Sequence, residues 1–151
     1  MAVEVYVWLP RADGNIGHAS MYVDGGTPAG PMYLSQWPGS SFIKALTIGS
    51  ACGQSYADDV KAEGGKPSVV RLTKLDETAV KKAIEYFQKH GLYGFFLLNC
   101  ANQVKLCLDW GVSGMGHLAT ILGRTNVIGY QLNDTPWGVY CYARGLTLLY
   151  G

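Results

Sequence analysis

The chain has 151 residues, of which 48% are hydrophobic and 15% charged, a balance that excludes a disordered protein and predicts one domain over residues 1–151. The formal net charge of +1 argues against a nucleic-acid partner or an anionic membrane surface. No apolar run approaches the roughly 18–20 residues of a transmembrane segment. The first ten residues lack the basic start and small-residue cleavage site of a signal peptide, so we expect synthesis in the cytoplasm.

Three strands are predicted first, over residues 4–9, 18–23 and 32–37, each alternating in polarity and each followed by glycine or proline. If Val23 pairs with Met32 across the loop between them, the numbers of paired residues sum to 55. The period of two then gathers five side chains on one face of the hairpin: His18, Ser20, Tyr33, Ser35 and Trp37.

The middle of the chain contains segments with and without a clear secondary-structure pattern. Residues 38–66 show no firm period and predict a short helix near 55–62, and residues 69–72 predict another strand. Asp76 is a typical helix cap, and Val80, Ile84 and Phe87 form the apolar stripe of a helix that Gly91 ends. Residues 95–98 are either a buried strand or an extended entry into the next helix.

Asn99 occupies a cap position before a second helix, whose apolar residues recur at helical spacing until Gly111. Residues 127–132 and 139–149 are rich in β-branched and aromatic side chains and predict further strands. The expected class is α+β, with an antiparallel sheet and helices packed on it.

The four cysteines do not have the spacing of a zinc site or a redox motif, and the three histidines do not complete one, so we expect no metal and no cofactor. Cys100 and Cys107 are seven positions apart on the predicted helix, about 10 Å along its axis, which is too far for a disulfide. The sequence leaves open whether Cys52 and Cys141 form a disulfide.

One arrangement predicts chemistry. Cys100 lies in the first turn of its helix, where unpaired N–H groups and the helix dipole favour a thiolate. His18 is the best placed base, and an imidazole needs a partner that orients it. The predicted strand register makes Ser35 that partner, with Gln36 as the alternative if the register slips by one residue, and Trp37 forms a wall. The backbone N–H of Cys100 would contribute to an oxyanion hole.

The other cysteines and histidines have less specific interpretations. A free cysteine is commonly a small buried hydrophobic residue, which suits Cys107 and Cys141 and is the alternative for Cys100 itself. Cys52 remains a second candidate nucleophile and His117 a second candidate base. We expect His90 to be a cation at a helix end.

Three segments, in order, resemble the circularly permuted papain-like superfamily, which includes permuted NlpC/P60, lecithin:retinol acyltransferase-like and PPPDE proteins. Residues 17–23 (GHASMYV) are similar to the histidine strand, and residues 33–38 (YLSQWP) to a strand of bacterial toxin and effector members. Residues 98–104 (LNCANQV) are similar to the start of the nucleophile helix. The resemblance covers much of residues 3–111, and its distinguishing mark is a histidine that precedes the cysteine.

The resemblance implies a cysteine peptidase or amidase in which Cys100 attacks, His18 moves the proton and a thioester forms, with Trp37, Gln36 and Asn99 contacting the substrate. The chain also resembles type VI secretion effectors, which reach the periplasm of a target bacterium and cleave peptidoglycan peptide. That implies a secretion apparatus and a cognate immunity protein as partners. A thiol acyltransferase, phospholipase or deamidase is the enzymatic alternative, although the further histidine of the acyltransferase branch has no match. A non-catalytic binding domain is the third reading.

Overall fold

The computed structural model describes residues 2–26, 29–38, 48–94, 99–112 and 135–151. Its strands form two antiparallel sheets. The four-stranded sheet has the order β3-β2-β1-β6 and contains β1 (Val3–Trp8), β2 (His18–Val23), β3 (Met32–Leu34) and β6 (Ser68–Leu72). The three-stranded sheet has the order β4-β5-β7 and contains β4 (Gln36–Pro38), β5 (Ile48–Gly53) and β7 (Leu92–Gly94).

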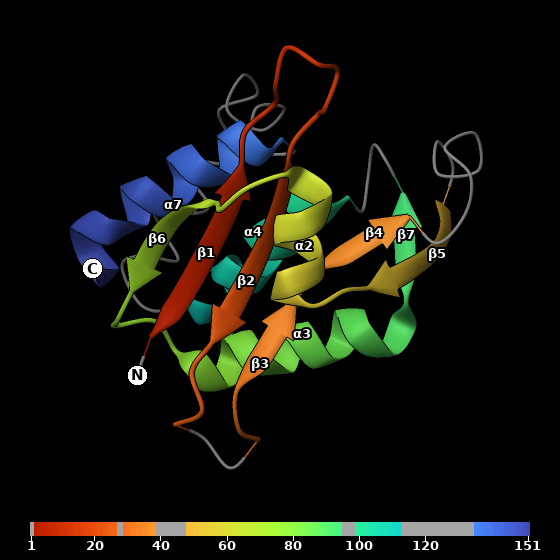
Figure 1. The fold of residues 1–151 in the computed structure, drawn as a ribbon. Coiled ribbons are helices and arrows are strands. Elements are labelled where there is room, and N and C mark those ends of the chain that lie inside the picture. The colour runs from red at the N-terminus through yellow and green to blue at the C-terminus, as the bar shows by residue number, and fades with distance from the viewer. Residues whose placement is uncertain (1, 27–28, 39–47, 95–98, 113–134) are drawn as a thin grey trace.

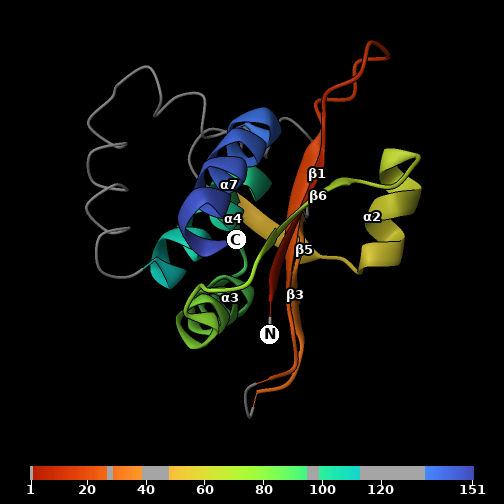
Figure 2. The same cartoon turned by 90° about the vertical axis from the view of Figure 1, so that its left-hand side faces the viewer.

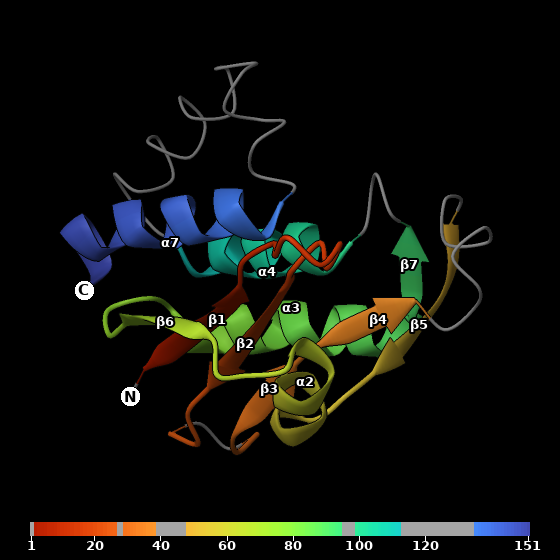
Figure 3. The same cartoon turned by 45° about the horizontal axis from the view of Figure 1, so that its top comes forward.

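Helices cover the four-stranded sheet on both faces. The described helices are α2 (Tyr56–Glu63), α3 (Glu77–His90), α4 (Cys100–Gly111) and α7 (Pro136–Tyr150). Helix α2 lies on one face of the sheet, whereas α3, α4 and α7 lie on the other (Figures 1 and 2). The three-stranded sheet lies beyond one end of the larger sheet (Figure 3). The predicted α+β class, with helices packed on an antiparallel sheet, is therefore confirmed.

The hairpin register follows the predicted sum of 55, because Val23 pairs with Met32 and Tyr22 pairs with Tyr33. The expected single strand over residues 32–37 is wrong, since the chain leaves β2 after Leu34. The next residues pair with β5 in the smaller sheet, where Trp37 lies opposite Cys52. The chain thus changes sheets at Ser35, next to the start of β2.

The helix ends are set by the capping residues that the sequence indicated. Asp76 accepts a hydrogen bond from the backbone N–H of Ala79 at the start of α3, and Gly91 ends that helix in the left-handed conformation. Asn99 caps α4 in the same way as Asp76 caps α3. The short helix expected near residues 55–62 is α2, whereas β5 was not foreseen.

The strand predicted over residues 139–149 is wrong, because these residues belong to α7. Its buried side chains include Val139, Ala143 and Leu146, which recur at the spacing of a helix rather than a strand. A helix start signal, Thr135 as the cap followed by Pro136, also precedes them. The strand expected over 127–132 and the extended segment 95–98 lie outside the described residues.

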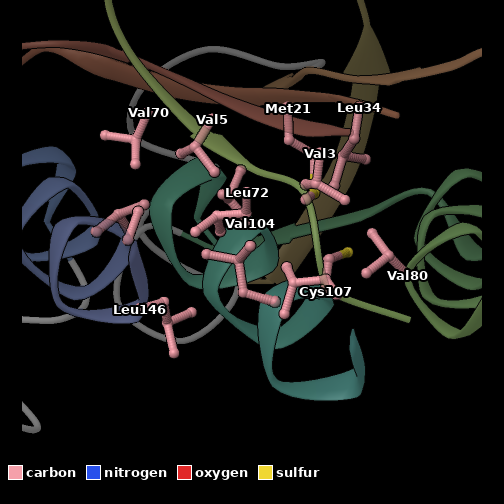
Figure 4. Close-up of a cluster of buried hydrophobic side chains, with 14 of the residues drawn as sticks. Val3, Val5, Met21, Leu34, Val70, Leu72, Val80, Val104, Cys107 and Leu146 are labelled. Atoms are coloured by element: carbon pink, nitrogen blue, oxygen red, sulfur yellow. The ribbon is translucent and has the colours of Figure 1, made fainter. Parts of the chain in front are cut away.

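The main core lies between the four-stranded sheet and helices α3, α4 and α7 (Figure 4). Val5 and Met21 point into it from the sheet, and Val104 and Cys107 meet them from α4. Because α4 is packed in this way, its first residue is held against the sheet at a fixed place.

Candidate active site

His18 is the first residue of β2 and is held by aromatic rings. It pairs with Trp8 in the neighbouring strand, and the two ring centroids are 5.7 Å apart. The indole of Trp37 stacks on the imidazole, with centroids 4.4 Å apart. His18 is only 2% exposed, so its ring has little freedom to rotate. Trp37 therefore covers one face of the His18 ring, and its role as a wall of the site stays a prediction.

The Nε2 atom of His18 faces a polar pair on the α2 side of the sheet. It lies 2.9 Å from the hydroxyl oxygen of Ser35, which in turn donates a hydrogen bond of 2.8 Å to Oδ1 of Asp59. Oδ2 of Asp59 also lies 3.5 Å from Nε2. Ser35 thus lies beside His18, where the strand register predicted it, and it connects the imidazole to a buried carboxylate that we did not predict. Its role as the orienting partner stays a prediction.

Asp59 accepts hydrogen bonds from two further side chains. The indole Nε1 of Trp37 donates to Oδ1 at 2.9 Å, and the hydroxyl of Tyr33 donates to Oδ2 at 2.5 Å. The Tyr33 hydroxyl also lies 2.7 Å from that of Ser20. Burial acts to raise the pKa of Asp59, but hydrogen bonds from its partners and the charge of His18 outweigh burial and lower it. The carboxyl group is therefore an anion.

Cys100 is the first residue of α4 and approaches His18 from the other helix layer. Cys100 is buried, with 9% of its surface exposed. Burial acts to raise the pKa of this thiol, whereas the charge of His18 and a hydrogen bond with it lower the pKa. Backbone N–H groups of Ala19 and Ala101 also bond the sulfur, and the net shift is downward. The site thus favours the thiolate.

The pKa of the His18 imidazole is shifted upward, in contrast to that of Cys100. Burial acts to lower the pKa of His18, but the negative charges and hydrogen bonds of Cys100 and Asp59 outweigh it and raise the pKa to about 9. Since Nε2 is engaged by Ser35, Nδ1 is the ring nitrogen left to the sulfur. The lowered pKa of Cys100 and the raised pKa of His18 together favour a thiolate–imidazolium pair between α4 and β2, with a second anion behind the imidazole.

The two remaining predicted site residues lie in other surroundings. Gln36 is buried, and its side-chain amide lies 3.5 Å from the carbonyl oxygen of Phe87 in α3, a long hydrogen bond. The side-chain oxygen of Asn99 bonds the backbone N–H of Asn102 as the cap of α4. These contacts place Gln36 against α3 and Asn99 at the cap of α4.

The other cysteines and histidines are placed as follows. Cys107 is buried in the core as expected, and burial raises the pKa of its thiol. The core position expected for Cys141 is wrong, because it lies exposed on α7, and Cys52 is also exposed. All four cysteines are free thiols. His90 occupies the last turn of α3 as expected, and His117 lies outside the described residues.

Asp59 carried a signal that the sequence reasoning missed. Tyr56 precedes it by three residues on α2, so the two side chains share one face of the helix. The ring of Tyr56 packs against Trp8 on the sheet, with centroids 6.5 Å apart. The spacing thus puts Asp59 on the same face of α2 as Tyr56, but it does not say what that face packs against.

Two further features of the described residues concern ligands. A cleft of about 300 Å³ lies beside Trp8, with Arg11, Glu63 and Lys66 on its rim, but neither Cys100 nor His18 lines it. In the part of the chain that the structure describes, no cluster of three metal-ligating side chains occurs and no helix is long and apolar enough to cross a bilayer.

Comparisons with models of protein families, with curated proteins and with solved structures find no match in any of the three.

Proposed function

We propose that the protein is a cysteine hydrolase of amide bonds that uses Cys100 and His18 in a circularly permuted papain-like fold. The observation that carries the proposal is the pairing of a sulfur at a helix tip with a buried imidazole. Helix N-termini and cationic neighbours are the surroundings that activate cysteine nucleophiles. The order of the histidine strand and the cysteine helix along the chain also supports the permuted arrangement.

The geometry supports a two-step reaction. The Cys100 thiolate attacks the carbonyl carbon of the amide, a C–S bond forms and the negative charge moves to the carbonyl oxygen. The imidazolium of His18 then gives its Nδ1 proton to the leaving nitrogen as the C–N bond breaks, which leaves a thioester. Neutral His18 next takes a proton from water, whose oxygen attacks the thioester and releases the thiolate.

The negative oxygen of each tetrahedral intermediate needs hydrogen-bond donors. The backbone N–H of Cys100 lies in the first turn of α4, where N–H groups have no partner four residues earlier in the helix. This N–H is our candidate for the oxyanion hole.

We further propose peptidoglycan peptide as the substrate and a secreted antibacterial effector as the biological role. The support for this part is the resemblance of the histidine strand, the YLSQWP segment and the cysteine helix to bacterial effector domains. A secretion apparatus and an immunity protein would then be its partners, and the periplasm of a target bacterium its place of action.

The test is digestion of purified peptidoglycan sacculi, followed by mass analysis of the released muropeptides. We expect new fragments with the natural chain and none with Cys100→Ala or His18→Ala, whereas Cys52→Ala, which changes an exposed cysteine, retains activity. No new fragments from the natural chain would contradict the wall substrate. Turnover of a lipid ester or a protein amide in parallel incubations would instead favour the acyltransferase, phospholipase or deamidase reading.

A further inference from the structure

We propose that Asp59 is a positioning residue whose buried negative charge, acting through the Ser35 hydroxyl, keeps His18 in the cationic form that pairs with Cys100. This inference rests on the proposed function, because it explains how the attacking thiolate is maintained. Asp59 comes from α2, on the opposite face of the sheet from α4, so the imidazole is held between anions from two different layers (Figure 2).

The hydrogen bonds between Asp59 and His18 can run in only one direction. A carboxylate is purely an acceptor, so the single proton of the Ser35 hydroxyl is committed to Oδ1 of Asp59. Toward Nε2 the same hydroxyl can therefore only accept. Ser35 thus requires a proton on Nε2 of His18, which both the imidazolium and one neutral tautomer provide.

Trp37 fixes this direction. Its indole N–H is a donor only and shares Oδ1 of Asp59 with the Ser35 hydroxyl. A donor at the position of Oδ1 would face the indole N–H and leave it unsatisfied in a buried site. The group opposite Ser35 must consequently be an acceptor.

The same constraint makes Asp59→Asn a clean removal of charge. The asparagine oxygen would take the place of Oδ1, where Trp37 and Ser35 donate. The new amide NH₂ would then face Tyr33, whose hydroxyl can accept that bond and turn its own proton toward Ser20. The hydrogen bonds with Trp37, Ser35 and Tyr33 each keep a donor and an acceptor, whereas the 3.5 Å contact between Oδ2 and Nε2 of His18 is lost together with the negative charge.

The negative charge of Asp59 is paired with His18. The ion pair with His18 is the single one that Asp59 forms among the described residues, at 3.5 Å. The titratable groups that face His18 are Asp59 from α2, Tyr33 from β3 through Asp59, and Cys100 from α4, while β1 contributes the uncharged ring of Trp8. Among the residues that the structure describes, loss of the Asp59 charge therefore leaves Cys100 as the one anion beside the imidazole.

The experiment is a ¹⁵N NMR titration of His18 in four proteins: the natural chain, Asp59→Asn, Ser35→Ala and Asp58→Asn. Asp58→Asn is the matched control, because it removes the same charge one position earlier in α2. There the side chain is exposed and is hydrogen-bonded to Ser55. We expect Asp59→Asn to lower the pKa of His18 by about 1–3 units, the usual effect of an opposite charge at this range. Asp58→Asn should leave it unchanged. Ser35→Ala should lower it less than Asp59→Asn does, because Oδ2 of Asp59 remains near Nε2.

Iodoacetamide labelling of Cys100 across pH provides the second measurement. In Asp59→Asn the pH at which Cys100 becomes reactive should move upward, since a less basic imidazole stabilises the thiolate less. The control Asp58→Asn should follow the natural chain.

The outcomes separate the two proposals. If His18 titrates alike in Asp59→Asn and the natural chain while Cys100 labels rapidly in both, Asp59 has no positioning role and the hydrolase proposal stands. If Cys100 labels as slowly as Cys107 in the natural chain, the proposed function itself fails. Should Asp59→Asn not fold, the natural chain still decides, because a His18 pKa at or below the ordinary value of about 6.5 would refute the inference.

Discussion

Selective alkylation of Cys100 is the sharpest consequence of the thiolate–imidazolium pair. Iodoacetamide reacts with thiolates, and an ordinary thiol with a pKa of about 8.5 is only about 0.3% ionised at pH 6. Lowering the pKa of a thiol raises its thiolate fraction at that pH, up to a ceiling of about 300 times at complete ionisation. Stabilised thiolates are weaker nucleophiles, with a Brønsted slope of about 0.4–0.5, and the 9% exposure of Cys100 slows access further. We therefore expect Cys100 to react faster than the exposed cysteines at pH 6, by up to roughly tenfold.

The other three cysteines are internal references for this measurement. Cys52 and Cys141 are exposed and report the reactivity of accessible thiols, while the buried Cys107 should remain unlabelled. Peptide mapping by mass spectrometry over time gives one rate for each site. The advantage of Cys100 should shrink as the pH rises toward 9, because the exposed thiols then ionise, and it should disappear in His18→Ala. Labelling of Cys100 more slowly than both exposed cysteines at pH 6 would refute the reasoning.

Three further predictions concern stability. Gly17→Ala should lower the free energy of unfolding in urea by at least about 1–3 kcal/mol, because Gly17 has φ of +81° and a Cβ there would lie 2.3 Å from the carbonyl oxygen of Trp8; an unchanged midpoint would contradict this. Asn99→Ala should cost about 0.5–2 kcal/mol in thermal or urea unfolding through loss of the α4 cap, whereas Asn99→Asp should keep the cap but slow alkylation of Cys100 by repelling its thiolate. Between the ordinary pKa values of about 6.5 and 8.5, the raised pKa of His18 makes stability fall with rising pH and the lowered pKa of Cys100 makes it rise, so the two effects oppose each other and stability should change little. Below that window the unfolded imidazole gains a proton and above it the unfolded thiol loses one, so unfolding titrations should show stability falling on both sides, and less so in Cys100→Ala.

The local parts of the fold could be predicted from the sequence because local chemistry determines them. Asp76, Gly91 and Asn99 mark helix ends through hydrogen bonds and backbone conformations that involve only a few neighbouring residues. The register of β2 and β3 follows from a short loop and the period of two. The same two kinds of reasoning placed His18 next to Ser35 and Cys100 at a helix tip.

The non-local parts could not be predicted in the same way. The break at Ser35 arises because the following residues pair with β5, which has no clear strand pattern of its own. Helix α7 is rich in residues that favour strands, and its packing against the sheet and α4 outweighed that propensity. Asp59 belongs to the site only because α2 folds back over the sheet, a contact that no spacing along the chain specifies.

The long separations between Ser35, Asp59, Cys100 and His18 along the chain have a consequence for synthesis and refolding. In an unfolded or half-made chain the sulfur has no imidazole beside it and behaves as any other thiol. Its reactivity therefore arises only after the sheet, α2 and α4 have assembled around His18. The rate at which this one sulfur is modified is accordingly a built-in reporter of native assembly, and it can be followed in a mixture without purifying the folded molecules.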